Sequence, residues 1–462
     1  MTPRSVQDLR DRLEALEREL GSVRAENERL RRALEEALRQ SKRQAAPHSR
    51  NNPKPDPKPS GRKSGSQYGA HARRRAPDRV DEQIRVPLPA TCECCGGRVV
   101  HTDSRPQFQE DIVRLTVVRR FDVEIGRCAA CGRRVQGRHP LQTSDALGAA
   151  QVQLGPEAVA VAAQLTKGRG LSHGAVADVL HHGYGLQVSR SGLCRAILRL
   201  GEKAAPTYEG LVQAVRTAPV AWLDETGWRV AAHLHWLWVA VTEDVTVFAI
   251  QAGRGFPEAA ALLGEDYDGF LHHDGWRPYY GFPQAFHQTC LAHLLRRCRD
   301  LIAIASPAAA CFPRAVRAHF QQALALRDRY AAGTISRHGL AVATGRLDAA
   351  MDRLLARSVR TPANRRLAQH LDHERPYLFS FLHCPGLDAT NNVAERALRP
   401  AVCARKTWGG NRTSVGARAQ QILASVLRTC WQQRKDAFPR LVGLLRSPVA
   451  QCLDLVPAAH SP

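Results

Sequence analysis

The chain has 462 residues, and its 66 lysines and arginines exceed its 43 aspartates and glutamates, which leaves a formal net charge of +23. So large a positive surplus favours a polyanionic partner, most often nucleic acid, and no apolar run reaches the roughly 18 residues of a membrane span. Thirteen cysteines spread along the chain do not fit a disulfide framework, and no secretory signal is visible, so we expect a cytoplasmic protein, associated with the nucleoid, without a membrane partner.

Residues 1–42 are predicted to form a coiled-coil helix (leucine zipper) that makes the protein a homodimer. Between Val6 and Ala37, apolar residues recur at the first and fourth positions of five heptads, with many Glu and Arg residues beside them. Asn27 occupies a first heptad position, where a buried amide disfavours other registers and higher oligomers. The alternative is a single amphipathic helix packed on its own chain, but the strict 3.5-residue spacing favours the dimer.

Residues 43–88 are predicted to be a flexible basic linker. Pro, Gly, Ser and Lys dominate the stretch NNPKPDPKPSGRKSGSQYGAHARRR, and almost nothing in it is apolar enough to form a core. The linker either lies along DNA phosphates or serves as an inert spacer.

Two Cys-x-x-Cys pairs, each followed by glycine, indicate one structural Zn²⁺ in residues 89–140. The pairs are Cys92 with Cys95 and Cys128 with Cys131. Four thiolates match tetrahedral zinc and leave no open coordination position. The intervening stretch EDIVRLTVVRRFDVEI alternates as a β-hairpin does and would bring the pairs together as a zinc ribbon. A redox pair or free thiols are the alternatives.

From 151 to 215 the pattern is helical. A helix at 172–182, a glycine-bearing turn and a second helix opened by Ser189 predict a helix-turn-helix. Arg190 and Arg195 near the start of the second helix are then candidate DNA contacts. Helix pairs of this kind are equally common as plain packing units, so both interpretations stay open.

From residue 216 the pattern becomes that of an α/β domain in which two strands end on acids. The stretch APVAWLDETGWRV carries Asp224, and GFLHHDGW ends on Asp274. The order is three strands in a meander, a helix, a strand, a short helix, a strand and a helix. This is the order of the ribonuclease H-like fold, where the first and fourth strands are adjacent. Asp224 and Asp274 would then emerge side by side.

Two carboxylates so close repel each other unless a divalent cation neutralises them. Oxygen ligands suit Mg²⁺ or Mn²⁺, and a pair of such ions about 4 Å apart serves phosphodiester chemistry. A third acid is needed, and Glu395 in NNVAERALRP fits. The alternative is an ordinary surface pair of Glu395 with Arg399, which would contribute about 0.3 kcal/mol.

Several motifs resemble the large transposase subunit of the insertion-sequence-sixty-six family: DET at 224–226, Asp274, CLAHLLRR at 290–297, NNVAERALRP at 391–400 and ARKTWGGNRTSVGA at 404–417. The order of zipper, linker, four-cysteine ribbon, catalytic domain and short tail is similar too. The resemblance implies a DDE transposase, whose triad of Asp224, Asp274 and Glu395 binds two Mg²⁺ or Mn²⁺ ions per site. It also implies small accessory proteins as partners.

Further residues near the triad are candidates for support or for DNA contact. Cys290 and His293 match a Cys-x-x-His element that many DDE enzymes carry, and we expect them to support the metal cleft rather than form half of a zinc site. The asparagines at the start of the Glu395 helix are predicted to cap it, with their amides near substrate phosphate. The candidate DNA contacts of this region are Asn391, Asn392, Arg396, Arg399, Arg405 and Lys406.

The sequence thus predicts a multidomain α+β protein. Its catalytic domain would cover 216–420 with a helical insertion at 300–388, and a helical tail would cover 421–462. The predicted function is a DNA transposase that binds double-stranded element ends and target DNA, cleaves strands and joins them. The alternatives are a metal-dependent nuclease or resolvase of the same fold, and a non-catalytic zinc-containing DNA-binding regulator.

Overall fold

The computed structural model describes residues 12, 16–17, 19–23, 26, 77–110, 115–142, 153–384 and 386–457. The chain divides into two compact units, Met1–Asp111 and Ile112–Pro462. Most of the predicted coiled coil, including Asn27, and the linker up to residue 76 lie outside the described residues. The few described residues of the coiled-coil segment are helical. None of the helices in the described part of the chain has the length and apolar character to cross a bilayer.

Each Cys-x-x-Cys pair folds into the same tight turn. In the first unit the Cys92 amide donates to the Gly97 carbonyl oxygen at 2.8 Å, and the Gly96 amide donates to the Cys92 carbonyl oxygen at 2.8 Å. In the second unit the amides of Cys128 and Gly132 make the equivalent bonds at 2.8 and 2.9 Å. Local sequence alone therefore specifies both turns.

The hairpin predicted between the two cysteine pairs is wrong where the structure describes it. Residues 115–124 contain no strand, and the antiparallel strands β1 (Ile125–Arg127) and β2 (Arg134–Gln136) instead flank the second cysteine pair. The alternating pattern has no core to face, since Leu115 and Val118 are 79% and 91% exposed. Alternation predicts a strand only where one of its faces can be buried.

The second unit begins with a group of helices: α2 (Pro156–Ala163), a π-helical turn (Gln164–Gly168), α3 (His173–Tyr184), α4 (Arg190–Lys203) and α5 (Ala205–Arg216). Ser172 caps α3 by accepting from the Ala175 amide at 3.2 Å, and Ser189 caps α4 by accepting from the Gly192 amide at 3.1 Å. The predicted pair of helices is confirmed to within two residues.

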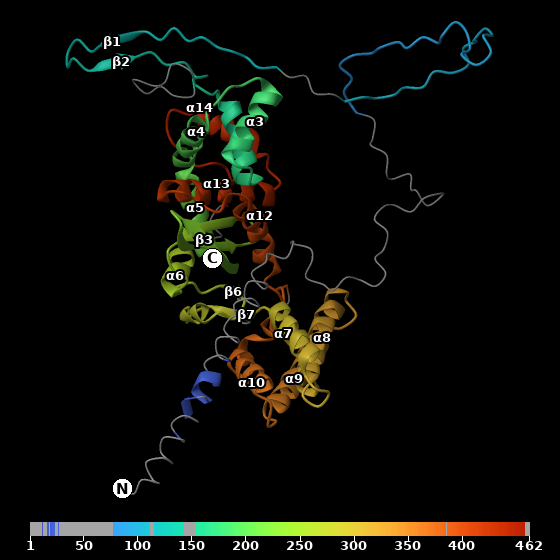
Figure 1. Ribbon diagram of the computed structural model, residues 1–462, viewed down its shortest axis with the longest axis vertical. Helices are drawn as coiled ribbons and strands as arrows, with labels where there is room; N and C mark the ends of the chain where they lie inside the picture. The colour runs from blue at the N-terminus through green and yellow to red at the C-terminus, as the bar shows by residue number, and fades with distance from the viewer. Residues whose placement is uncertain are drawn as a thin grey trace. The chain divides into compact units, whose positions relative to one another are not determined.

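Five strands form one mixed sheet in the order β5-β4-β3-β6-β7, of which Figure 1 labels β3, β6 and β7. They are β3 (Val220–Val230), β4 (His233–Val241), β5 (Thr246–Gln251), β6 (Phe270–His273) and β7 (Phe286–Thr289). The first three form an antiparallel meander, and β6 lies parallel to both β3 and β7. Helix α6 (Phe256–Leu263) and a 3-10 turn (Arg277–Gly281) connect the later strands. The predicted adjacency of the first and fourth strands is confirmed.

The two faces of the sheet carry different cores because side chains alternate along each strand. On one face, Trp228 and Val239 pack against Ala394 and Leu398 of α12 (Asn392–Trp408). On the other face, inward residues such as Leu223 join the large core that includes helices α5 and α6. Asp224 therefore faces α12, whereas its neighbour faces the opposite way.

Helix α13 (Ser414–Gln432) covers the free edge of the sheet. The Phe248 amide of β5 donates to Ser425 Oγ at 2.8 Å, and the Thr246 amide donates to Thr429 Oγ1 at 3.1 Å. Helix side chains thus take the place of a neighbouring strand and block pairing at this edge. Helix α13 runs unbroken through residue 420 and is followed by α14 (Ala437–Arg446).

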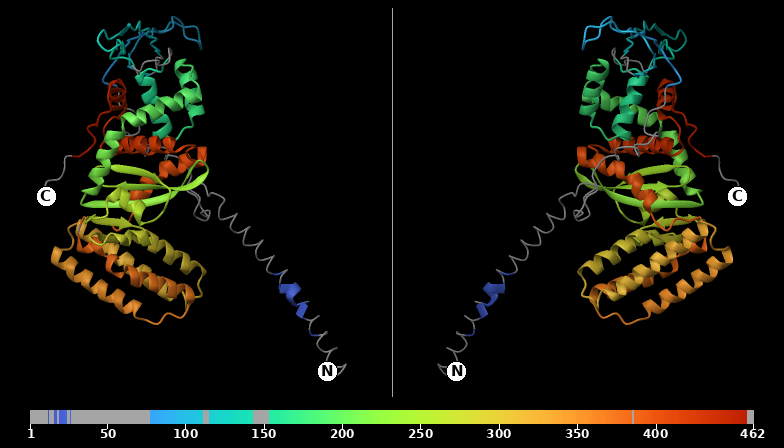
Figure 2. Two further views of the ribbon diagram at one scale, coloured as in Figure 1. Left: turned by 90° about the vertical axis from the view of Figure 1, so that its left-hand side faces the viewer. Right: turned by 90° about the vertical axis from the view of Figure 1, so that its right-hand side faces the viewer.

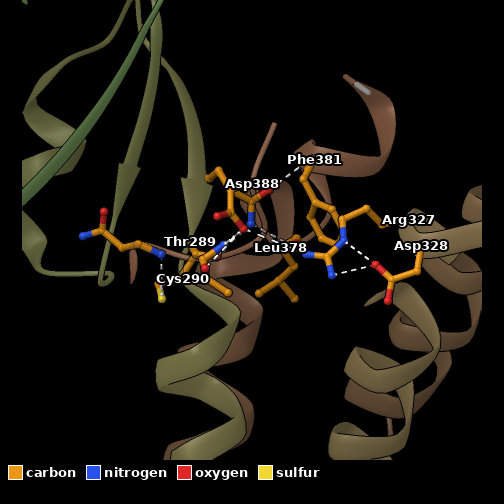
Figure 3. Close-up of polar contacts among 10 residues, drawn as sticks. Thr289, Cys290, Arg327, Asp328, Leu378, Phe381 and Asp388 are labelled. Carbon is orange, nitrogen blue, oxygen red and sulfur yellow. Dashed lines mark hydrogen bonds and ion pairs between the residues drawn. The ribbon is translucent and has the colours of Figure 1, made fainter. Parts of the chain in front are cut away.

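Between β7 and α12 the chain forms a helical bundle with its own core (Figure 2). Its helices are α7 (Leu291–Ile304), α8 (Cys311–Ala331), α9 (Arg337–Leu355), α10 (Pro362–Glu374), a 3-10 turn (Arg375–Tyr377) and α11 (Ser380–His383). Buried Gln288 of β7 anchors the bundle to the sheet: its amide nitrogen donates to the Leu378 carbonyl oxygen at 3.3 Å, and its amide oxygen accepts from the Phe381 amide at 2.9 Å. Figure 3 shows Leu378 and Phe381 beside the end of β7.

Candidate active site

The strand register places the two aspartates at the same level of the sheet. Trp222 of β3 pairs with His272 of β6 in a parallel ladder, and Asp224 and Asp274 each follow two residues later. Asp274 comes directly after the last residue of β6. Asp224, however, lies in the middle of β3, which continues to Val230, so the prediction that this strand ends on its acid is wrong. Because both aspartates lie two residues beyond the same parallel pair, they lie at the same level and on the same face of the sheet.

The third acid arrives on helix α12. Glu395 lies in the first turn of this helix, next to Ala394, which is buried on the sheet. The Asn391 side-chain amide donates to the Leu223 carbonyl oxygen at 2.6 Å and fastens the start of α12 to β3 beside Asp224. The alternation that turns Asp224 towards α12 thus turns it towards Glu395.

Electrostatics show that the three acids are neighbours. The pKa of Asp224 is raised well above its ordinary value, first by burial and then by the negative charges of Glu225, Asp274 and, more weakly, Glu395. The Glu225 amide offsets part of this by donating to Asp224 Oδ1 at 2.9 Å. A divalent cation would remove the repulsion that raises this pKa.

The donor chemistry of the site fits Mg²⁺ or Mn²⁺ because all three side chains offer carboxylate oxygens. Glu395 Oε1 is buried and lacks a hydrogen bond; its ion-pair partner is His293 Nε2 at 3.5 Å. Within the described ranges, however, no three His, Cys, Asp or Glu side chains lie close enough together to hold a metal ion as they stand. The three acids therefore offer suitable ligand atoms, but in the described structure their side chains do not enclose a position for one ion.

The model of the family described as Transposase IS66 family matches residues 151–419. This chain belongs to the IS66 transposase family. The matched stretch contains the sheet, the helical bundle, α12 and all three acids, whereas both cysteine pairs lie outside it. No curated protein matches the chain. The family resemblance of the sequence is therefore confirmed.

In this IS66 transposase a second acid of the DET motif supports the site from the far side of the sheet. Buried Glu225 accepts from Arg254 Nε at 2.6 Å and from the Tyr279 hydroxyl. The guanidinium of Arg254 lies between the Trp236 and Trp276 rings, at 4.7 and 4.3 Å from their centroids. Sequence reasoning missed this network, although strand alternation already predicts opposite directions for adjacent acids.

The turn after β6 is fixed by its own backbone bonds. The Gly275 amide donates to His273 Nδ1 at 3.0 Å, and the Trp276 amide donates to Asp274 Oδ1 at 2.9 Å. Since His273 Nδ1 accepts, its Nε2 carries the proton and donates to His287 Nδ1 at 3.1 Å. Burial lowers the pKa of His273 well below its ordinary value, which favours this neutral form. The orientation of Asp274 thus depends on a neutral histidine pair.

Cys290 and His293 connect the bundle to α12. The buried Cys290 sulfur accepts from the Asn391 amide at 3.1 Å, and burial raises the pKa of this thiol. His293 contacts Glu395 one helical turn further on. In the described residues neither side chain belongs to a cluster that could hold a metal ion. Both residues therefore lie where α7 meets the start of α12, next to the helix that carries Glu395.

The predicted DNA contacts of α12 fall into two groups. Asn391 is fully buried, and the prediction that its side chain caps the helix is wrong because that amide bonds β3 instead. Arg405 is half-buried and donates to Thr226 Oγ1 at 3.3 Å and to the Gly227 carbonyl oxygen, and burial lowers its pKa. The other candidates are exposed: Asn392, Arg396, Arg399 and Lys406 on this helix and Arg190 and Arg195 on α4.

The alternative of a Glu395–Arg399 surface pair does not describe this helix. Among the described residues, the ion-pair partner of Glu395 is His293 of α7. Arg399 is exposed, and in the described structure no ion pair joins it to Glu395. The glutamate therefore turns towards the sheet and the bundle rather than along its own helix.

The turn of each cysteine pair favours the thiolate form of its first cysteine. Hydrogen bonds from the Cys95 and Cys94 amides lower the pKa of Cys92, and those from the Cys131 and Ala130 amides lower the pKa of Cys128. Amides that point at sulfur favour the thiolate, which is the form that binds zinc. Each pair has this property by itself, and the two belong to different units of the chain.

Proposed function

We propose that this IS66-family transposase is a DDE enzyme that cleaves DNA at the ends of its element and joins the freed 3′ end to target DNA. The observation that supports the proposal is geometric: Asp224 and Asp274 lie level on adjacent parallel strands, and Asn391 bonds the start of the Glu395 helix to the Leu223 carbonyl oxygen beside Asp224. The strand order β5-β4-β3-β6-β7 supports a ribonuclease H-like catalytic domain. Fold alone does not give function, so the acids carry the argument.

In this proposal Asp224, Asp274 and Glu395 hold two Mg²⁺ or Mn²⁺ ions. Bound there, the ions would activate the attacking oxygen and stabilise the leaving oxygen of the phosphodiester. Binding of a cation would displace the Asp224 proton to solvent, and His293 lies beside Glu395 at 3.5 Å. The Asn391 and Arg405 bonds to β3 hold the helix that carries the third acid.

The exposed basic residues are the proposed contacts to DNA. Arg396, Arg399 and Lys406 lie on the helix of the third acid and would grip phosphate near the reacting bond. Arg190 and Arg195 lie at the start of α4 and would contact the element ends. Asn392 is exposed and is also proposed to contact DNA, whereas Asn391 is buried and is not.

The remaining parts of the proposal rest on the sequence. They are a homodimer through the coiled coil at 1–42, one structural Zn²⁺ bound by the four paired cysteines, accessory proteins as partners, and a place of action at the nucleoid. The lowered pKa values of Cys92 and Cys128 support zinc binding by their turns.

The test is Glu395→Gln, which keeps the size of the side chain but removes its charge. Cleavage of end-containing DNA in Mg²⁺ should fall by several orders of magnitude, while the Kd for that DNA should stay within about twofold, because the proposed DNA contacts are other residues. Glu209→Gln, an exposed acid of α5, is the matched control and should cut normally.

The product pattern separates the competing functions. A transposase yields strand-transfer products joined to target DNA, a nuclease or resolvase of the same fold cuts without this joining, and a regulator binds without cutting. Near-normal cleavage by Glu395→Gln would contradict the proposed triad. Wild-type protein that binds the ends but never cuts them in Mg²⁺ or Mn²⁺ would leave only the regulator.

A further inference from the structure

Helix α10 of the bundle buries a carboxylate where its pattern calls for an apolar side chain. Asn364, Leu367, Leu371 and Glu374 share the buried face of this helix, and Glu374 is 0% exposed. A buried acid costs stability unless its oxygens are paired. Apolar packing therefore does not explain why a carboxylate occupies this position, and its hydrogen bonds have to be considered.

One oxygen of Glu374 joins two segments that lead into the candidate active site. Oε2 accepts from the Tyr280 hydroxyl and, at 2.5 Å, from Thr289 Oγ1. Tyr280 belongs to the 3-10 turn that follows Asp274, and Thr289 is the last residue of β7, directly before Cys290. A single side chain of the bundle thus holds both the Asp274 turn and the entry to α7.

The other oxygen of Glu374 lies against the backbone beside Asp274. A Cβ placed on Gly275 would be 3.4 Å from Glu374 Oε1 and 3.5 Å from His370 Cε1. Gly275 has φ +87°, a conformation that favours glycine, and Glu374 Oε1 lies at contact distance from this turn. Oε1 is buried and has no hydrogen-bond partner. It borders the turn that presents the second catalytic acid.

We propose that Glu374 is a positioning residue through which the helical bundle holds the Asp274 turn in the geometry that binds the divalent cations. This inference rests on the proposed function of the three acids. It gives the bundle a role in the reaction: an inserted helical domain that fixes a carboxylate of the sheet. Glu374 acts through Tyr280, Thr289 and the Gly275 backbone and does not itself touch the reacting atoms.

The experiment measures Mn²⁺ binding to the full-length protein by electron paramagnetic resonance, together with the Kd for end-containing DNA and the rate of cleavage. Residues that orient metal ligands typically change metal affinity or activity by about 10- to 100-fold. Glu374→Gln should therefore weaken Mn²⁺ binding about tenfold and slow cleavage, with an unchanged Kd for DNA. Tyr280→Phe keeps the Glu374 charge but loses its hydrogen bond, and it should act in the same direction.

The matched control is Asp348→Asn in α9. Asp348 pairs with Arg375 Nη1 at 2.7 Å inside the same bundle, and the described structure gives it no bond to the Asp274 turn. The control should keep wild-type Mn²⁺ affinity even if it lowers the Tm. Equal weakening by Asp348→Asn would mean that general loss of bundle stability explains the effect, which would overturn the inference.

The remaining outcomes separate this inference from the proposed function. Wild-type Mn²⁺ affinity in folded Glu374→Gln, while Asp224→Asn loses binding, overturns the inference alone. Weakening by Glu374→Gln but not by Tyr280→Phe would mean a simple charge effect and would also overturn it. If Glu374→Gln does not fold, Tyr280→Phe decides. Wild-type protein that binds no Mn²⁺ overturns both proposals.

Discussion

Adjacent residues of one strand serve opposite sides of this active site. Asp224 turns towards α12 and the other two acids, whereas Glu225 turns into the core beneath Arg254 and Tyr279. Burial raises the pKa of both carboxyls, but the hydrogen bonds from Tyr279 and Arg254 counteract the rise at Glu225. Within the described part of the chain, the hydrogen bond that lowers the pKa of Asp224 comes from the amide of Glu225. A bound cation would offset the unfavourable free energy of ionising the buried Asp224 carboxyl beside the other acids.

The raised pKa of Asp224 makes the free energy of unfolding depend on pH. A carboxyl whose pKa is raised in the fold binds its proton more tightly in the folded than in the unfolded state. The free energy of unfolding therefore falls as pH rises from the unfolded value of 3.8 through the raised folded pKa of Asp224. Above that pKa the metal-free protein carries the full penalty.

We predict that Asp224→Asn stabilises the metal-free protein at pH 8 by about 1–3 kcal/mol, because the substitution removes a buried charge and its repulsion. Wild-type protein should gain Tm on addition of Mn²⁺, and the gain should grow as the pH rises through the raised pKa of Asp224, since metal must displace the Asp224 proton. Calorimetric melting curves with and without Mn²⁺ measure both effects. An Asn variant that Mn²⁺ stabilises as strongly as wild type would contradict the role of Asp224 as a ligand.

Among the helices and strands, the features that could be predicted are those that depend on short stretches of sequence. The apolar stretch APVAWLDETGWRV predicted the strand that carries Asp224, although not its continuation to Val230, and Ser189 predicted the start of a helix that it caps. The hairpin at 110–125 failed because period-two alternation says nothing about a partner surface. The bond between Tyr280 and Glu374 spans 94 positions, so only tertiary packing could bring these side chains together. The three acids could be selected from the sequence and stay a prediction, whereas most of the hydrogen-bond network around them could not be foreseen.

The covered sheet edge leads to a prediction about α13. Ser425 Oγ accepts from the Phe248 amide at 2.8 Å in a buried setting, so Ser425→Ala leaves that amide without its acceptor. An unsatisfied buried donor costs about 1–3 kcal/mol. Urea unfolding should show a loss of this size. Ser414→Ala, at the exposed start of the same helix, should stay within about 0.5 kcal/mol of wild type. Equal effects of the two changes would show that the helix does not complete this edge.

Across the whole molecule, the residues proposed to bind DNA differ from those proposed to cleave it. The net charge of +23 is spread over a chain whose described basic side chains at α4 and α12 are largely exposed, whereas the acids of the site are partly or wholly buried. Association with DNA should then depend on salt, because each phosphate contact releases counterions. Cleavage of bound DNA should depend on the three acids instead. The two properties can be separated by mutation.

The separation is tested at α4, where the sequence left DNA reading and plain packing equally open. If Arg190 contacts a phosphate, Arg190→Ala should weaken binding to end-containing DNA and reduce the slope of log K against log salt by about 0.9, and Arg195→Ala should do the same. Arg190→Lys, which keeps the charge, should retain the wild-type slope. The cleavage rate at saturating protein should be unchanged in all three variants, whereas Asp274→Asn should bind normally and not cut. Binding curves at four salt concentrations give the salt slope, and single-turnover cleavage gives the cleavage rate. A wild-type salt slope in both alanine variants would mean that α3 and α4 are a packing pair and that the element ends are bound elsewhere.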